Sequence, residues 1–306
     1  MEEKPRGVLV LGGDGFIGRH AVHALRAAGA SVTIGSRRMR GADRRVARFE
    51  RLLDVDAWSP ILAGAGVVLN CVGILRPRGG ASYERVHHFA VAALAEACAA
   101  YRLPLVHVSA LGLESPARSG FLVSKRRGEA ALMRSRADWR LVRPALLDGD
   151  GGYGAAWIRR VARWPVHPVP TDAVGRLAPL DVGELGLALA ALCLAPPPAS
   201  DDPHSRVFEL GGPDVRDVST HLAAMDPRGG RKWCVRVPPS LARLVSHACD
   251  VLHATPFSFG HLELLRRDNV PRVNRMEELI GRSPRRVGEA LDKRPTVEDE
   301  ETPTWV

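Results

Sequence analysis

The stretch VLVLGGDGFIGRH, residues 8–20, decides the fold because an apolar run here ends in a glycine-rich turn. A continuous apolar run is typical of a strand buried on both faces of a parallel sheet. Gly12, Gly15 and Gly18 follow at three-residue spacing. In a strand-to-helix turn, the first glycine permits the bend, the second lets backbone approach a pyrophosphate, and the third lets the helix pack closely. The pattern predicts a dinucleotide site, with a purely structural turn as the alternative.

Strand-like and helix-like segments alternate through the first half of the chain. Apolar strand candidates lie at 31–36, 47–52, 66–73, 103–112 and 139–147, with helical patterns between them at 89–102 and 124–135. Such alternation predicts right-handed crossovers and a doubly wound parallel sheet, the Rossmann α/β fold. We expect residues 1–150 to form the nucleotide-binding domain, completed by late strands at about 176–181 and 206–212.

After residue 150 the pattern changes to loops, proline-rich segments and helices. We expect residues 151–175 and 213–290 to form a smaller, mostly helical lobe that holds a substrate or a partner. Residues 291–306 are acidic and should form a tail.

One helical pattern in this lobe, at residues 240–252, has a single apolar face. That face contains Leu241, Leu244, Val245, Ala248 and Val251. Because its polar face is not strongly basic, we expect the helix to pack on the core rather than lie on a membrane.

Composition excludes several classes of protein. The 306 residues are 45% hydrophobic with a formal charge of +9. The arginines are scattered and no aromatic residues interleave with them, which argues against a nucleic-acid site. The five cysteines show no paired spacing, so we expect a reducing compartment and neither disulfides nor a metal site. Without an apparent signal peptide or transmembrane segment, a cytoplasmic protein is expected.

The end of the second strand carries Ser36, Arg37 and Arg38. NAD sites usually have an acidic residue here, which holds the ribose hydroxyls. Arginine side chains instead suit a 2′-phosphate, and a serine can donate to it. The sequence therefore favours NADP(H) over NAD(H), with a solvent-facing basic turn as the alternative.

The glycine loop, with Phe16 and Ile17, resembles the extended and atypical short-chain dehydrogenase/reductase superfamily, which includes epimerase/dehydratase-like proteins. The resemblance covers about residues 7–285. Within the superfamily, the chain is most similar to bacterial proteins related to the NADPH-binding 39 kDa accessory subunit of respiratory complex I. The further cofactor contacts that the resemblance implies are made by Asp54, Val55, Asn70, Cys71, Val72, Gly73, Pro144 and Ala145.

The superfamily's catalytic pair is a tyrosine and a lysine four residues later, on one face of a helix. The segment SGFLVSKRRGE, residues 119–129, has Phe121 and Lys125 at this spacing. The resemblance implies that Lys125 holds the nicotinamide ribose. A phenyl ring has no exchangeable proton and cannot act as general acid or base.

Other side chains are candidates for the missing proton donor. The resemblance gives Ser109 a place beside the substrate, and Tyr153 lies in a glycine-rich loop on the expected substrate side. With Lys125 they form the predicted catalytic set. Two functions stay open: an NADP(H)-dependent oxidoreductase or epimerase acting on a small or lipid-like molecule, and a non-catalytic NADP(H)-binding protein of a respiratory or membrane-associated complex. With either function the expected location is the cytoplasm, and peripheral association with the inner membrane stays open.

Overall fold

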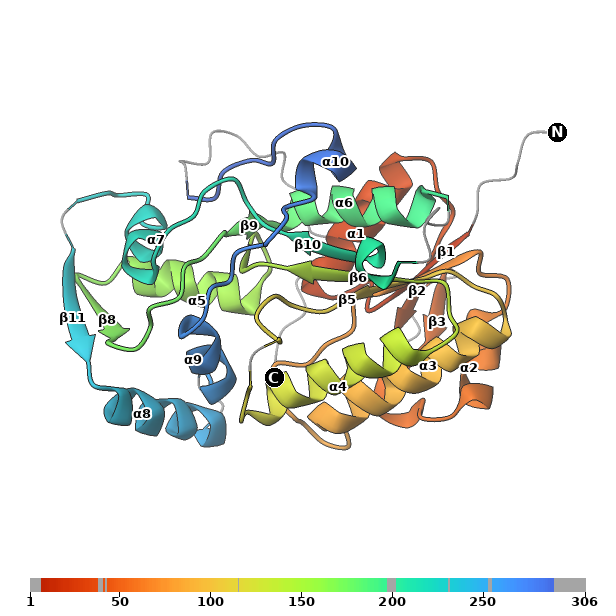
Figure 1. Cartoon of the computed structure of the whole chain (residues 1–306), viewed down its shortest axis with the longest axis horizontal. Coiled ribbons are helices and arrows are strands. Elements are labelled where there is room, and N and C mark those ends of the chain that lie inside the picture. Colours follow the sequence, from red (N-terminus) through yellow and green to blue (C-terminus); the bar gives the residue numbers. More distant parts are fainter. Residues whose placement is uncertain are drawn as a thin grey trace.

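The computed structural model describes residues 7–37, 41, 43–114, 116–196, 202–230, 232–252 and 255–288. Arg38 and the acidic tail lie outside these residues. The main feature is a sheet of seven parallel strands (Figure 1). In sheet order they are β10 (Val207–Leu210), β6 (Trp139–Pro144), β5 (Leu105–Val108), β4 (Val67–Asn70), β1 (Val8–Leu11), β2 (Val32–Ser36) and β3 (Arg44–Val46). The predicted doubly wound α/β fold is confirmed.

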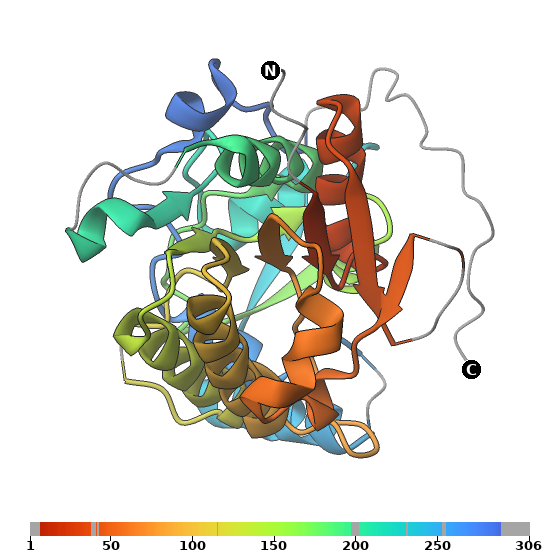
Figure 2. The same cartoon turned by 90° about the vertical axis from the view of Figure 1, so that its right-hand side faces the viewer.

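Helices cover both faces of this sheet (Figure 2). One face carries α1 (Phe16–Ala27), α6 (Val182–Leu194) and α10 (Met276–Ile280). The other carries α2 (Val55–Leu62), η2 (Glu84–Phe89), α3 (Ala90–Ala100) and α4 (Gly120–Arg134), with the short turn η1 (Phe49–Arg51) nearby. Because the chain leaves β1 toward β2 and later returns to β4 on the other side, the strand order reverses beside β1. Ligands of open α/β sheets bind at this reversal, beyond the carboxyl ends of the strands.

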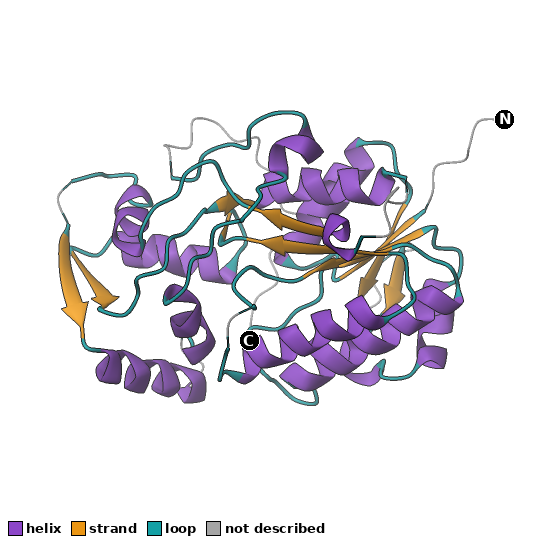
Figure 3. Cartoon of the chain, viewed as in Figure 1, coloured by secondary structure: helices purple, strands orange, loops and turns teal. Residues whose placement is uncertain are grey.

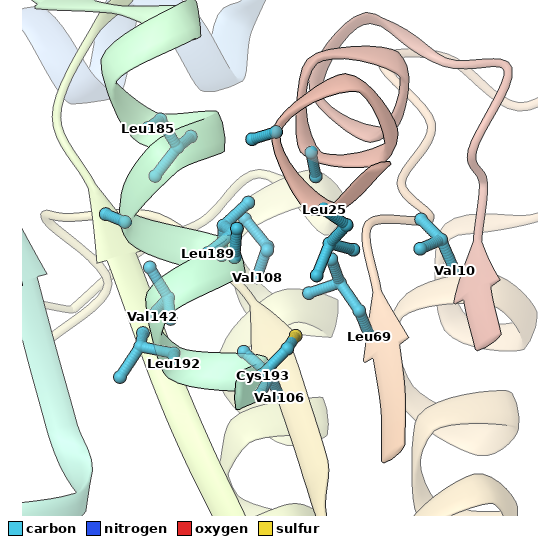
Figure 4. Packing of buried hydrophobic residues seen from close by; sticks show 14 of the residues in the cluster. Val10, Leu25, Leu69, Val106, Val108, Val142, Leu185, Leu189, Leu192 and Cys193 are labelled. Carbon is cyan, nitrogen blue, oxygen red and sulfur yellow. The ribbon is translucent and has the colours of Figure 1, made fainter. Parts of the chain in front are cut away.

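The core on the α1 side is continuous from the helices to the sheet (Figure 4). Leu25 of α1 and Leu189 of α6 are fully buried against strand residues such as Val10 and Leu69. Each side chain of this size contributes roughly 1.5–3 kcal/mol when removed from water. The two helices approach closely because Gly186 has no side chain, and a Cβ there would lie 2.7 Å from the carbonyl oxygen of His20.

A second, smaller lobe occupies the far end of the molecule (Figure 3). It contains α5 (Tyr153–Ala162), β8 (Val166–Pro170), α7 (Val218–Ala224), β11 (Trp233–Val237), α8 (Pro239–Leu252) and α9 (Phe259–Leu265). Strands β8 and β11 form a separate two-stranded parallel sheet. The turn η3 (Pro203–Arg206) precedes β10, and β7 (Leu147–Asp148) pairs with β9 (Leu180–Asp181).

Two strand predictions were wrong in position. The third strand is 44–46, whereas residues 47–52 form a turn whose Phe49 and Leu52 are buried. The apolar residues of 47–52 therefore belong to a turn that packs on the core, not to a strand. In the segment 176–181 only β9 is a strand, and it lies outside the main sheet. Pro179 precedes it and cannot donate to a strand ladder.

The prediction that residues 240–252 pack their apolar face on the core was also wrong. In α8 the buried positions are Ala242 and Ser246, while Leu244 is 67% exposed and Val251 is 76% exposed. The helix packs through its small side chains, and its large apolar side chains face solvent. The described part of the chain has no helix both long enough and apolar enough to span a bilayer.

Candidate active site

The glycine turn between β1 and α1 has the geometry that the sequence predicts. Gly12 has a φ of +76°, which favours glycine, and a Cβ there would lie 3.0 Å from Val72 Cγ2. A Cβ at Gly18 would lie 2.1 Å from the carbonyl oxygen of Gly12, so only glycine fits. A Cβ at Gly15 would lie 3.1 Å from the same Gly12 carbonyl oxygen, its nearest neighbouring atom. Of the three, Gly15 is thus the least constrained by its neighbours.

The start of α1 suits an anion. Gly15 is the N-cap residue, and it provides no side-chain hydrogen bond. The first turn of α1 contains no acidic side chain. The unpaired N–H groups and the partial positive charge of the helix end therefore remain available for a phosphate. Ile17 packs on the core, and the Phe16 ring lies against Gly152. The turn fits the pyrophosphate of a dinucleotide.

Strand β2 brings its basic end to the same edge. The Gly12 N–H donates to the carbonyl oxygen of Gly35 at 2.8 Å, so Ser36 and Arg37 follow directly beside the turn. Ser36 is buried and Arg37 is exposed. The structure adds Arg44 of β3, which forms an ion pair with Asp14 of the glycine turn. Sequence reasoning missed Arg44 as a site residue, although the arginine-rich stretch after β2 was a signal.

The predicted adenine contacts lie at the start of α2. Asp54 is its N-cap residue and Val55 its first residue, and both are exposed. At the other end of the site, Pro144 and Ala145 are buried, and the backbone of each forms a hydrogen bond. The Pro144 carbonyl accepts from Leu111 N–H at 3.1 Å, and Ala145 N–H donates to the Leu210 carbonyl at 2.8 Å. These two residues shape the floor between β5, β6 and β10.

The end of β4 forms the next wall. Asn70 is fully buried; its Nδ2 lies 3.0 Å from His107 Nδ1, and its Oδ1 accepts from Val72 N–H at 3.0 Å. Its side chain therefore holds the loop rather than pointing to an open site. Burial raises the pKa of the Cys71 thiol, so it stays protonated. A Cβ at Gly73 would lie 3.8 Å from both Lys125 Nζ and His87 Nε2.

Lys125 places a cationic amine beside Phe121. The described residues give its amine no hydrogen bond, and it lies 5.8 Å from the centroid of the Phe121 ring. Burial lowers the pKa of Lys125 to about 8, and the charge of Glu129 opposes this shift. A buried amine without partners is costly, and the hydroxyls of a ribose would supply hydrogen bonds to it. Lys125 fits the cofactor contact that the resemblance implies.

His87 cannot replace the tyrosine as a proton donor to substrate. The N–H of Ile74 donates to its Nε2 at 3.0 Å, so the ring proton lies on Nδ1. Nδ1 is 3.1 Å from Ser124 Oγ, which itself donates to the Phe121 carbonyl at 3.0 Å. Burial, then the charge of Lys125, lower the pKa of His87 well below its usual range. The ring is neutral and both of its nitrogens are engaged.

Aromatic rings enclose Phe121. Tyr83, the N-cap residue of η2, and His87 within η2 lie edge-on to the Phe121 ring, with ring centroids 5.7 and 5.6 Å away. His261 of α9 stacks on the Phe121 ring at a centroid distance of 5.9 Å. Phe121 is only 8% exposed, and a Cβ at Gly260 would lie 3.1 Å from it. The phenyl ring is thus a packed part of the wall between the sheet and the second lobe.

The family model described as NAD(P)H-binding matches residues 12–177, more than half of the chain. The chain belongs to the NAD(P)H-binding family. This family member is 30% identical, over 208 residues, to a ceramide reductase of Caulobacter vibrioides (strain NA1000 / CB15N). The alignment spans 64% of this chain and 64% of the reductase, just under two thirds of that relative's length.

Solved structures share the fold of this NAD(P)H-binding protein. A structure of MoeE5 in complex with UDP-glucuronic acid and NAD matches with a TM-score of 0.63 and 19% identity, covering 92% of this chain and 94% of the other. The UDP-N-acetylglucosamine 4-epimerase of Bacillus cereus matches with a TM-score of 0.58 and 17% identity, covering 85% and 95%. The prediction of an NAD(P)-binding family is confirmed by the family model, and these solved structures, at 17% and 19% identity, show the same fold.

The other two predicted catalytic residues of this NAD(P)H-binding protein, Ser109 and Tyr153, have no described contact with Lys125. Ser109 follows β5 and is buried, and its hydroxyl forms no hydrogen bond within the described residues. Tyr153 begins α5 and is 58% exposed, with no described contact to Lys125 or Phe121. His261 was missed because only folding brings α9 onto α4. Burial, then the charge of Arg76, lower the pKa of His261 to about 4, so this ring is neutral too.

Proposed function

We propose that this protein is an NADP(H)-dependent oxidoreductase that acts on a carbonyl or alcohol group of a lipid-like molecule. The observation that carries the proposal is the pairing of an uncapped helix start at the glycine turn with the unpaired amine of Lys125. The first suits the pyrophosphate and the second suits the nicotinamide ribose. In this proposal residues 1–150, with β10, hold the nucleotide, and residues 151–175 and 213–290 hold the substrate.

The nicotinamide, when bound, would supply or accept the hydride. Lys125 would orient the ribose, and its pKa of about 8 also lets it exchange a proton near neutral pH. Ser109 would hydrogen-bond to the substrate oxygen, since its hydroxyl has no described partner. Tyr153 would contact the substrate from the α5 side. Phe121 would form a wall of the site without donating a proton.

A preference for NADP(H) over NAD(H) is supported by basic side chains at the end of β2. Arg37 would reach a 2′-phosphate together with Ser36, and Arg44 would add a second guanidinium from β3. Because Arg44 pairs with Asp14 across the glycine turn, a bound phosphate would compete with that carboxylate.

A lipid-like substrate is supported by the likeness to a ceramide reductase. The wall around Phe121 is consistent with this class, because Leu113, Leu122 and Leu264 pack with the ring.

A second candidate function is a non-catalytic NADP(H)-binding protein of a respiratory or membrane-associated complex. The phenylalanine at position 121 favours it, because the superfamily's usual proton donor is absent. The resemblance to the complex I 39 kDa subunit supports the same function. In either case we propose a cytoplasmic location, with peripheral association to the inner membrane.

Calorimetry with NADPH and NADH tests the proposal. We expect NADPH to bind more tightly, and Arg37→Ser to reduce the difference by about tenfold, or about 1.4 kcal/mol. Turnover is then measured with NADPH and a series of long-chain ketones, beside short-chain ketones as the control. Tight NADPH binding without any turnover would select the non-catalytic function. Failure of both nucleotides to bind would exclude both.

A further inference from the structure

The outward side of α8 is apolar. Leu241, Leu244, Val245, Val251 and Leu252 of this helix are all exposed. The opposite side holds Ala242 and Ser246, which are buried against the protein. An amphipathic helix normally buries its large apolar side chains. Here the protein-facing side is already occupied by small residues, so the apolar side is left for a partner outside the chain.

A second apolar face lies next to this helix, on the sheet of β8 and β11. In the parallel register Trp233 pairs with Val166, and Val235 pairs with Pro168, so these four side chains share one face. Trp233 is 71% exposed, and the other three are exposed as well. On the opposite face His167 and Val169 of β8 are buried, whereas their β11 partners Cys234 and Arg236 are exposed. Strand β11 leads directly into α8 at the end of the molecule away from the main sheet (Figure 1).

The charge around these two faces has one sign. Four exposed arginines have no acidic partner within the described residues: Arg160, Arg163, Arg236 and Arg243. Between residues 232 and 252 the single acidic residue is Asp250, and it pairs with Arg76 at 3.0 Å. An apolar face that carries an exposed tryptophan and is rimmed by arginines matches the boundary layer of a bilayer with anionic headgroups. Two copies of this chain would instead bring the same arginines together, which opposes self-association.

We infer that α8 and the outer face of β8 and β11, together called the apical face, bind the surface of a membrane that contains anionic lipids. The polar side of α8 contains a single arginine, Arg243, which is exposed, while Ala242 and Ser246 pack on the protein. The other three arginines lie in neighbouring segments. The inference deepens the proposed membrane location by naming the surface and the lipid chemistry. Bilayer binding does not depend on catalysis; only the delivery of a substrate rests on the proposed function.

Two contacts connect the apical face to the candidate site. Asp250 of α8 pairs with Arg76, which follows the β4 loop, and it also accepts from Phe259 N–H at the start of α9 at 3.0 Å. On α9, His261 stacks on Phe121. A protein held by α8 would therefore keep the wall of its site next to the membrane surface, where a lipid-like substrate would enter.

Sedimentation with vesicles tests the inference on the full chain. The vesicles contain phosphatidylcholine alone, or phosphatidylcholine with about 30% phosphatidylglycerol. We expect the natural protein to sediment with the anionic vesicles. The double variant Leu244→Ser with Val251→Ser should lower the partition coefficient about tenfold or more. The double variant Arg236→Gln with Arg243→Gln, which removes two of the four arginines, should lower it by a similar factor and weaken its salt dependence.

The matched control is Leu187→Ser with Val273→Ser, which removes two exposed apolar side chains elsewhere and should bind vesicles normally. A natural protein that stays in the supernatant with anionic vesicles overturns the inference, as does a Leu244/Val251 variant that binds like the natural protein. A concentration-dependent dimer, lost in that variant and without vesicle binding, would assign the face to a second copy. Vesicle binding without NADPH binding would leave this inference standing and remove the proposed function.

Discussion

The amine of Lys125 lies 5.8 Å from the centroid of the Phe121 ring, one helical turn earlier on α4. The lysine stands at the superfamily's spacing, but Phe121, four residues before it, has no hydroxyl. Since His87 and His107 beside it are neutral, Lys125 is, among the described residues around Phe121, the cation that titrates near neutral pH. This arrangement separates cofactor binding from proton transfer, and the two can be tested independently.

Replacing Lys125 with methionine should stabilise the protein without cofactor and weaken its binding of NADPH. The folded pKa of about 8 lies below the ordinary 10.5, so the folded state holds fewer protons between these values. The natural protein therefore gains up to about 3 kcal/mol of stability as the pH rises from about 8 to 10.5. The Lys125→Met variant should lack this gain, as measured by urea unfolding at several pH values. Arg126→Met, an exposed neighbour, is the control.

Binding of NADPH should follow the same titration in the opposite direction. The ammonium form of Lys125 holds the ribose, so affinity should fall as the pH rises through about 8 and should be independent of pH in the Lys125→Met variant. An affinity of the natural protein that does not change between pH 7 and 9 would argue against the ribose contact.

Replacing Phe121 with tyrosine should raise turnover with NADPH about tenfold or more, because general acid–base catalysis contributes at least this much. The new tyrosine hydroxyl would lie one helical turn from Lys125, and the charge of Lys125 would lower the pKa of that hydroxyl. Binding of NADPH should not change. If turnover stays constant while the variant folds normally, the proton enters from another group, and Tyr153→Phe and Ser109→Ala then identify it. The comparison needs steady-state rates on one long-chain ketone.

The glycine turn gives a prediction in which folding and binding separate. Gly15→Ala should change the free energy of unfolding by less than about 1 kcal/mol, because φ is −77° there and the nearest atom to the new Cβ is 3.1 Å away. It should weaken NADPH binding about tenfold or more, or about 1.4 kcal/mol. Gly18→Ala should cost about 2 kcal/mol or more of stability, because its Cβ would meet Gly12 at 2.1 Å. Equal effects of both substitutions on stability would contradict this.

The parts of the structure that sequence predicts well are local. The strand, turn and helix from Val8 to Ala27 depend on residues close in the chain, and so does the spacing of Phe121 and Lys125. Helical periodicity also identified the apolar face of α8. Periodicity does not predict which side of a helix packs on the rest of the protein. In α8 that side is set by contact with α9, a helix that comes later in the chain. The stacking of His261 on Phe121 joins residues 140 positions apart, so no local pattern could have shown it.

Glu263 should hold the second lobe against the active-site helix. Its carboxylate accepts from the N–H groups of Arg118 and Ser119 at 2.9 and 2.8 Å, just before α4 begins. Burial raises the pKa of Glu263, but hydrogen bonds from Ser119 and Arg118 outweigh it and place the pKa below the ordinary value. Glu263→Gln should cost roughly 1–2 kcal/mol of stability at neutral pH, because charge-assisted hydrogen bonds are lost.

This stabilisation should depend on pH. A lowered folded pKa means that Glu263 stabilises the fold fully above the unfolded value of about 4.5, and that the contribution disappears as the pH falls through the folded pKa. The natural protein and Glu263→Gln should therefore converge in stability at low pH. Glu96→Gln changes an exposed glutamate of α3 and should have little effect at any pH. A constant difference between the natural protein and Glu263→Gln from pH 3 to 7, measured by chemical unfolding, would show that the carboxylate charge does not hold the lobe.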